Sequence, residues 1–217
     1  MSEFTVHSVP GSPFGRAVLA VFAGKAASFH FNNLRPVMRT EAHLALHPFG
    51  RIPVLAHGDF LLYETQAILR YLDRVLPGPS YTPGDAKAAA RMDQLLNISD
   101  WYLMQGVNDV IGFQRIVGPA LFGLQPDEAK IAEAMPKAHM VFAELSKLLG
   151  AGPYFAQAQS PNLADIMIAC HLDFLAQTPE WAELAKGRDN LSDWLARMNS
   201  QPFMQATTWE KVSALAA

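Results

Sequence analysis

HPFGRIPVL, residues 47–55, ends in a strand pattern that contains a proline. Proline has no N–H to donate to a sheet, so a central strand does not accommodate it. Pro53 is therefore either the first residue of a strand or part of an edge strand, or it follows a cis peptide bond. A cis bond before proline costs only about 0.5–1 kcal/mol. A cis bond would turn the N–H and C=O of Ile52 out of the sheet, where an extended peptide ligand can pair with them as an added strand. The dipeptide alone leaves both interpretations open.

The composition is that of a globular chain with little net charge. Half of the 217 residues are hydrophobic, and the formal net charge is −3 without a basic run, which argues against a nucleic-acid partner. The single cysteine, Cys170, cannot form an internal disulfide and is predicted to be a buried thiol. We expect no metal site. No stretch reaches the roughly 18 apolar residues of a membrane helix, and the start is too polar for a secretory signal, so we expect a cytoplasmic protein without membrane association.

Two parts of different character follow one another along the chain. Residues 1–77 mix strand and helix patterns in the order βαβαββα, which predicts a small α/β domain. Residues 78–84 are rich in proline and glycine and are predicted to be a linker. Residues 85–217 carry helical patterns and are predicted to form an all-helical domain.

The apolar spacing and the turn residues place each expected element. The expected strands are 4–9, 28–31, 52–56 and 60–62, and the expected helices are 14–24, 40–46, 64–76, 85–118, 126–149, 162–176, 180–186 and 190–198. Pro136 lies inside one of these helices and is predicted to kink it.

Three motifs in this order resemble the cytosolic glutathione transferase family. HPFGRIPVL resembles the family segment NPFGxVPxL, with His47 in place of the usual Asn. LYETQAILRYL (62–72) resembles LxESxAIxxYL, and NLADIMIAC (162–170) resembles the capping segment [ST]xAD. The resemblance covers nearly the whole chain. It implies a thioredoxin-like domain followed by a helical domain, glutathione as co-substrate, conjugation to a hydrophobic electrophile, and a homodimer.

The resemblance also implies a residue that contacts the glutathione sulfur. The thiolate is the nucleophile, and a free thiol with a pKa of about 8.5 is only a few per cent ionised at pH 7. Ser12 stands before Pro13 at the start of the first helix, where a hydroxyl and the helix dipole both favour the thiolate. A plain N-cap is the alternative for Ser12, and Ser8 is the second candidate. Because residues 1–20 contain no Tyr or Cys, the chain resembles the serine/threonine, bacterial-like type.

Glutathione carries two carboxylates and one ammonium, and the resemblance places them on three segments. The backbone of Ile52, with Pro53, pairs with the tripeptide. Glu64 and Thr65 begin a helix and bind the γ-glutamyl end, unless they only cap that helix. The resemblance assigns the glycyl carboxylate to Arg51, with Arg39 as a further candidate; surface solubility is the alternative for Arg51.

The electrophile is expected between the Ser12 loop and the helical domain. Its predicted contacts are apolar side chains that also suit a core: Trp101, Tyr102, Met104 and Phe113, with Ile116 and Phe122 as further members. Four single residues have further expected roles. Trp209 is a candidate cover of the site, and Phe49 is either an anchor inserted between the partner's helices or a residue buried in its own domain. Asp100 is a candidate acid for the ammonium of the partner's ligand, and Arg16 either raises the local potential or makes an ordinary surface or interdomain pair.

Alternative functions and one structural motif remain. Glutathione-dependent disulfide or peroxide reduction is a second enzymatic hypothesis, and a non-catalytic binding or scaffold protein is a third. Isomerisation is less consistent with SVPGSPFGR, which lacks cysteine. Asn162 and Asp165 have the spacing of a capping box, so Asp165→Ala is expected to cost about 0.5–2 kcal/mol of stability.

Overall fold

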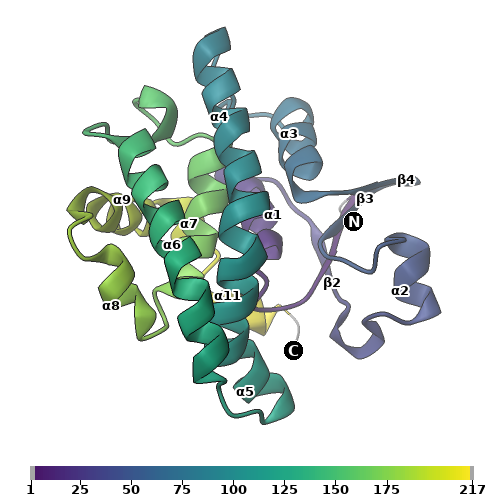
Figure 1. Ribbon diagram of the computed structural model, residues 1–217. Helices are drawn as coiled ribbons and strands as arrows, with labels where there is room; N and C mark the ends of the chain where they lie inside the picture. The colour runs from purple at the N-terminus through teal and green to yellow at the C-terminus, as the bar shows by residue number, and fades with distance from the viewer. Residues whose placement is uncertain (1–2, 216–217) are drawn as a thin grey trace. The chain divides into compact units, whose positions relative to one another are not determined.

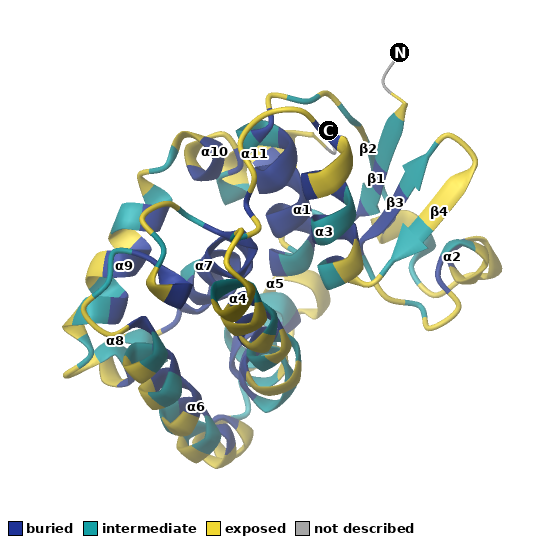
Figure 2. Ribbon diagram, turned by 90° about the horizontal axis from the view of Figure 1, so that it is seen from above, coloured by how far each residue is buried: buried dark blue, intermediate teal, exposed yellow. Residues whose placement is uncertain are grey.

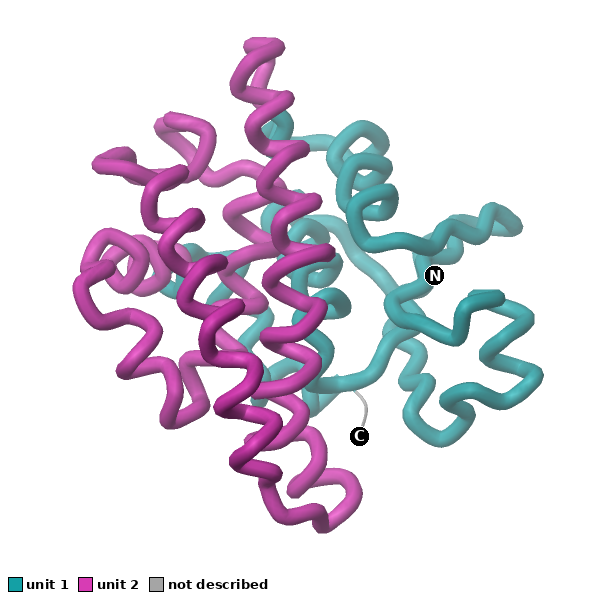
Figure 3. The backbone as a smooth tube through the Cα atoms, viewed as in Figure 1, with its two compact units in different colours: residues 1–82, 199–217 teal, residues 83–198 magenta. Residues whose placement is uncertain are grey.

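The computed structural model describes residues 3–215, and its chain divides into two compact units (Figure 3). Unit 1 comprises residues 1–82 with 199–217, and unit 2 comprises residues 83–198. The C-terminal segment thus groups with the first unit, whereas the sequence analysis assigned it to the helical domain. The limits of independently folding domains, at 1–77 and 85–217, stay a prediction.

A four-stranded sheet with the order β2-β1-β3-β4 organises unit 1 (Figure 1). The elements are β1 (Phe4–Ser8), α1 (Pro13–Gly24), β2 (His30–Asn33), η1 (Arg35–Val37), α2 (Glu41–Leu46), β3 (Val54–His57), β4 (Phe60–Tyr63) and α3 (Thr65–Val75). β1 is parallel to β2 and antiparallel to β3, and β4 is antiparallel to β3. The predicted order βαβαββα is confirmed.

Helices α1 and α3 cover one side of this sheet, and α2 lies beyond the other (Figure 2). The side chains between the sheet and these two helices are at most 1% exposed: Val6, Phe22, Leu55 and Ile68. From Ala17 to Phe22 every residue of α1 is buried, which is the pattern of a helix with neighbours on all sides.

The second neighbour of α1 is the C-terminal segment, whose helices the sequence analysis did not predict. These are α10 (Pro202–Gln205) and α11 (Trp209–Ala214). Arg16 of α1 is 3% exposed. Its Nε donates to the Thr207 carbonyl at 2.6 Å, and its guanidinium carbon lies 4.4 Å from the Trp209 ring centroid. Arg16 is therefore a buried tie to the C-terminal segment and not a surface residue.

The segment after α3 is held by a buried carboxylate. Asp73 pairs with Lys25 at 2.9 Å and accepts the Tyr81 N–H at 2.8 Å. Burial raises the pKa of Asp73, but these donors and the Thr82 hydroxyl outweigh it, so that the pKa lies below its usual value. The predicted linker is accordingly ordered against α1 and α3.

All of the regular secondary structure of unit 2 within the described residues is helical. Its elements are α4 (Ala86–Ile98), η2 (Ser99–Val117), α5 (Gly118–Phe122), α6 (Glu128–Leu149), η3 (Phe155–Gln157), α7 (Leu163–Leu175), α8 (Glu180–Ala185) and α9 (Asp189–Asn199). Residues 85–118 are mostly helical, as predicted, but η2 is a wider π-type segment whose backbone is non-helical at Gln105 and Gly106. Gly106 has φ +80°, which favours glycine. Helix α6 continues through Pro136.

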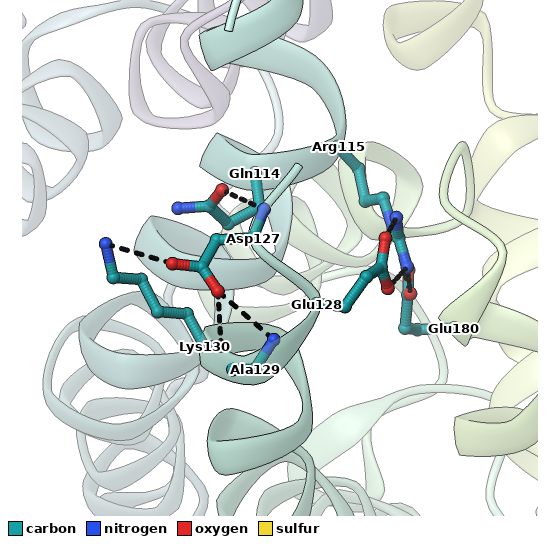
Figure 4. A network of polar contacts seen from close by, with 7 residues as sticks. All are labelled: Gln114, Arg115, Asp127, Glu128, Ala129, Lys130 and Glu180. Carbon is teal, nitrogen blue, oxygen red and sulfur yellow. Dashed lines mark hydrogen bonds and ion pairs between the residues drawn. The ribbon is translucent and has the colours of Figure 1, made fainter. Parts of the chain in front are cut away.

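A polar network joins η2 to α6 and α8 within unit 2 (Figure 4). The Arg115 guanidinium donates to both oxygens of Glu128, at 2.6 and 2.8 Å, and to Glu180 at 2.6 Å. The two carboxylates, Glu128 first, raise the pKa of Arg115. Asp127 caps α6, and its own N–H donates to the Gln114 side chain at 2.8 Å. These contacts fix the loop between α5 and α6. Across residues 3–215, every helix is too short or too polar for a membrane span.

Candidate active site

Three segments of unit 1 meet at one end of the sheet. Val54 pairs with His7 of β1 on one side and with Tyr63 of β4 on the other. One residue further along this register, Pro53 lies between Ser8 and Glu64. The carboxyl end of β1, the amino end of β3 and the carboxyl end of β4 therefore place the Ser12 loop, Ile52-Pro53 and Glu64-Thr65 beside one another, as the sequence motifs require.

Ser12 caps α1 and keeps its hydroxyl proton. Its backbone is extended, with φ −78° and ψ 119°, and its Oγ accepts the Gly15 N–H at 3.1 Å. A serine hydroxyl has one proton and two lone pairs, so accepting one hydrogen bond leaves the proton available to a ligand. Ser12 is half-buried at the positive end of α1. The N-cap role and a ligand contact are compatible.

Ser8, the second candidate, lies deeper. It is 0% exposed, and its Oγ has no hydrogen-bond partner within residues 3–215. It packs against Gly15, where an added Cβ would come within 2.3 Å of the Ser8 Oγ. Gly15 therefore has to lack a side chain. A fully buried hydroxyl is less accessible to a ligand than that of Ser12.

The Ile52-Pro53 peptide bond is cis. Pro53 is buried and precedes β3, whereas Ile52 is half-buried and lies outside the strand. Within residues 3–215, the N–H and C=O of Ile52 make no backbone hydrogen bond. Both groups thus have open hydrogen-bonding capacity at the edge of the sheet.

Helix α3 begins without a capping side chain, unlike α1, α4, α6 and α7. Neither Glu64 nor Thr65 therefore supplies a side-chain cap to this helix. Glu64 is exposed and has φ +70° and ψ 112°, an uncommon conformation for a residue with a side chain. Such strain concentrates where a ligand is held. Thr65 is 8% exposed at the first turn, whose amide groups point outward along the axis of the helix.

Arg39 and Arg51 are both exposed, and one histidine connects their backbones. The Arg39 N–H donates to His43 Nδ1 at 3.0 Å, and His43 Nε2 lies 3.0 Å from the Arg51 carbonyl. His43 is 0% exposed. The sequence analysis missed His43, although its place between the two arginines and four residues before His47 was a usable signal.

His47, the departure from the family motif, fills a turn. It is 2% exposed, its Nδ1 accepts the Phe49 N–H at 3.3 Å, and its ring lies 4.6 Å from that of Tyr63. Burial lowers the pKa of His47. Phe49 itself is 70% exposed. The alternative that Phe49 is buried in its own domain is therefore wrong.

The aromatic residues predicted to contact the electrophile do not form a core. Trp101 is 60% exposed and Tyr102 is 56% exposed. Met104 and Phe113 are half-buried, and the Phe113 ring lies 6.3 Å from that of Phe122. The exposed pair remains available for contacts that the chain does not make with itself.

Three further residues have structural roles, as predicted. Cys170 is 0% exposed in α7. Asn162 and Asp165 form a capping box at the start of α7. Within residues 3–215, no three His, Cys, Asp or Glu side chains lie close enough together to hold a metal ion.

Comparison with known proteins agrees with this architecture. The sequence patterns for the glutathione S-transferase N-terminal and C-terminal domains match residues 6–80 and 128–197. Glutathione S-transferase F10 of Arabidopsis thaliana is 28% identical over 204 residues, which are 92% of this chain and 91% of the relative. Human glutathione S-transferase theta-2B is 31% identical over 169 residues, 75% of this chain and 65% of the relative. The apo structure of glutathione S-transferase III covers 94% of both chains, with 27% identity and a TM-score of 0.82.

A four-stranded mixed sheet with its helices, followed by a helical unit, defines a thioredoxin-like domain and a helical domain. The chain belongs to the glutathione S-transferase family of enzymes. The predicted family and fold are confirmed. The serine/threonine, bacterial-like subtype stays a prediction.

Proposed function

We propose that this enzyme binds glutathione on unit 1 and transfers its thiolate to a hydrophobic electrophile. The observation that carries this proposal is the meeting of three unsatisfied groups at one end of the sheet. They are the Ser12 hydroxyl proton, the backbone of Ile52 and the uncapped start of α3. A tripeptide with a thiol, a carboxylate and an extended backbone has the chemistry to satisfy all three.

Each segment has its part in holding glutathione. Ile52 pairs with the cysteinyl backbone beside Pro53. Thr65 and the first amides of α3 bind the γ-glutamyl carboxylate, while Glu64 pairs with the ammonium. Arg51 and Arg39 face the glycyl carboxylate, which suits the planar guanidinium.

The reaction needs an ionised sulfur. Ser12 donates its proton in a hydrogen bond to the thiolate, and the positive end of α1 lowers the thiol pKa further. The thiolate then attacks the electrophilic carbon. A carbon–sulfur bond forms, and the leaving group departs with its electron pair. Trp101, Tyr102, Met104 and Phe113 are the proposed apolar contacts of the electrophile.

Glutathione-affinity capture and turnover of chlorodinitrobenzene, which releases chloride, test this proposal. Ser12→Ala should still bind the glutathione resin, but its turnover at pH 7 should fall roughly tenfold to a hundredfold, because a hydrogen bond to a charged group contributes about 1.5–3 kcal/mol. Its activity should also shift to higher pH, since the thiol loses a stabilising donor.

Ser12→Thr is the matched control, because it keeps a hydroxyl that both caps the helix and donates. Ser8→Ala should retain turnover. Full activity in Ser12→Ala would refute the role of Ser12, and full loss in Ser8→Ala would transfer that role to Ser8. A parent protein that neither binds the resin nor turns over the substrate would refute the function itself.

Three further features belong to the proposal. We infer a homodimer in which the exposed Phe49 is the anchor inserted into the partner, with Asp100 offered to the partner's ligand. We also infer a cytoplasmic location. Sedimentation of the parent and of Phe49→Ala tests the dimer: the variant should dissociate at concentrations at which the parent remains dimeric.

A further inference from the structure

His43 has a hydrogen-bonding arrangement that a single protonation state satisfies. The Arg39 N–H is a donor only, so His43 Nδ1, 3.0 Å away, has to be the unprotonated acceptor. The Arg51 carbonyl is an acceptor only, so Nε2, also 3.0 Å away, has to carry the proton and donate it. The neutral Nε2–H tautomer meets both demands. With 0% of its surface exposed, His43 has no room for other partners from solvent.

This histidine joins the backbone before α2 to the backbone that precedes β3. Arg39 precedes α2 and has φ +62°, in the left-handed region. In this conformation the Arg39 N–H points at the His43 imidazole and donates to it. Arg51 follows Gly50, which also has a positive φ, of +61°. His43 thus fixes the backbone on both sides of α2.

The stem of the Arg39 side chain lies near the residue that precedes Arg51. A Cβ built on Gly50 would be 3.8 Å from Cγ of Arg39, so the Arg39 stem passes over the residue directly before Arg51. Both side chains are exposed, and neither guanidinium makes a hydrogen bond or ion pair within residues 3–215. Two exposed guanidinium groups without a protein counter-charge have the chemistry to bind a carboxylate.

We infer that His43 is a positioning residue that aligns Arg39 and Arg51 on one carboxylate of the substrate, the glycyl carboxylate of glutathione. This inference rests on the proposed function. His43 itself does not touch the substrate. It acts by holding the backbones that carry the two guanidinium groups, and the carboxylate lies between them.

Steady-state kinetics with His43→Phe, which keeps an aromatic ring but removes both hydrogen bonds, tests the inference. The KM for glutathione should rise about tenfold or more, because a small misplacement of a binding group is costly. The kcat at saturating glutathione and the KM for chlorodinitrobenzene should stay near the parent values. A general loss of structure would instead change all three. His43→Gln, which keeps one donor and one acceptor, should restore most of the glutathione affinity.

His47→Phe is the matched control, because it removes another buried histidine of the same segment. His47 accepts a hydrogen bond from Phe49 and makes none to either arginine. Its KM for glutathione should equal that of the parent. γ-Glutamylcysteine, which lacks the glycyl carboxylate, supplies the second arm. Parent and His43→Phe should bind it equally, while only the parent should gain affinity from the added glycine.

The outcomes separate the two proposals. A parent that does not bind glutathione refutes the proposed function. If the parent and His43→Phe bind glutathione equally well, the role of His43 is refuted and the proposed function stays intact. If His43→Phe does not fold, the variants Arg39→Ala and Arg51→Ala supply the test. Both should raise the KM for glutathione and leave the binding of γ-glutamylcysteine unchanged. If neither variant has this effect, the inference that the two arginines bind the glycyl carboxylate is refuted.

Discussion

At the scale of single residues, Ser12 shows how one hydroxyl can meet a structural and a chemical demand. Its oxygen accepts the Gly15 N–H, which stabilises the start of α1. Its proton is left for another acceptor. The sequence presents an N-cap and a ligand contact as alternatives, but the geometry makes them compatible, since accepting and donating use different parts of the hydroxyl group.

Glu64 and Thr65 show the opposite case, in which a helix start is left without a cap. Glu64 occupies the N-cap position with φ +70° but supplies no side-chain acceptor. Because the first amides of α3 have no partner within the helix, they and the Thr65 hydroxyl are suited to an anion.

We predict that Thr65→Val weakens glutathione binding by roughly tenfold to a hundredfold, because it removes a hydrogen bond to a carboxylate, worth about 1.5–3 kcal/mol. Isothermal titration with glutathione measures this change. Stability in a urea melt should stay near that of the parent, since no cap is lost. Thr65→Ser should bind like the parent, and equal affinities of all three proteins would contradict the prediction.

At the scale of elements, the start of α7 is held by more than a capping box. Asp165 is 0% exposed. It accepts the Asn162 N–H at 3.0 Å, the Phe155 N–H at 3.0 Å and the Trp194 Nε1–H at 2.8 Å. One carboxylate thereby joins α7 to η3 and α9, which no local motif reveals.

Asp165→Ala should therefore destabilise the protein by about 3 kcal/mol or more, above the cost of about 0.5–2 kcal/mol expected for a cap alone, because buried donors are left unsatisfied. Urea denaturation gives the free energy of unfolding. Asp85→Ala, which removes an exposed cap from α4, is the control and should cost less. A loss no larger than in the control would show that the additional bonds contribute nothing.

At the scale of the whole molecule, the two ends of the chain belong to one unit. Arg16 on the first helix is held by Thr207 and Trp209 near the last. Phe203 of α10 lies 6.0 Å from Tyr81, at the end of the first part of unit 1. The C-terminal segment therefore completes the burial of α1.

The contribution of His171 of α7 to stability should fall as the pH is lowered from 7 to 4.5. Burial lowers the pKa of His171 to about 4, although its hydrogen bond to the Met167 carbonyl opposes the shift. The unfolded chain binds a proton near its ordinary pKa of about 6.5, whereas the folded protein does not bind it until about 4, so protonation favours unfolding in this range. The contribution is about 2 kcal/mol.

Urea melts of the parent and of His171→Leu at pH 7 and pH 4.5 measure this contribution. The parent should lose about 2 kcal/mol more than the variant between the two pH values, since the variant lacks the titrating ring. Equal losses in the two proteins would show that His171 does not contribute to the pH dependence of the free energy of unfolding.

Much of the architecture could be predicted from local patterns. The alternation of elements around Pro53, the helix start at Ser12 and the capping box at Asn162 each depend on residues within about one turn or strand of each other. Helices α10 and α11 were missed because four to six residues are too few for a clear apolar period. The break in η2 was missed because glycine within a helical pattern does not by itself mark a break.

The sequence by itself determined the family, the order of the elements and the segments proposed to bind glutathione, because these follow from short-range spacing and from motifs that stay intact in one chain. Only the tertiary structure decided that His43 bridges Arg39 and Arg51, that α3 lacks a cap and that the C-terminal segment packs on α1. The first two features are hydrogen bonds made or left unmade by particular side chains within about eight residues, and the third is a contact between the two ends of the chain. No periodicity encodes such contacts, since they arise only when the elements pack together.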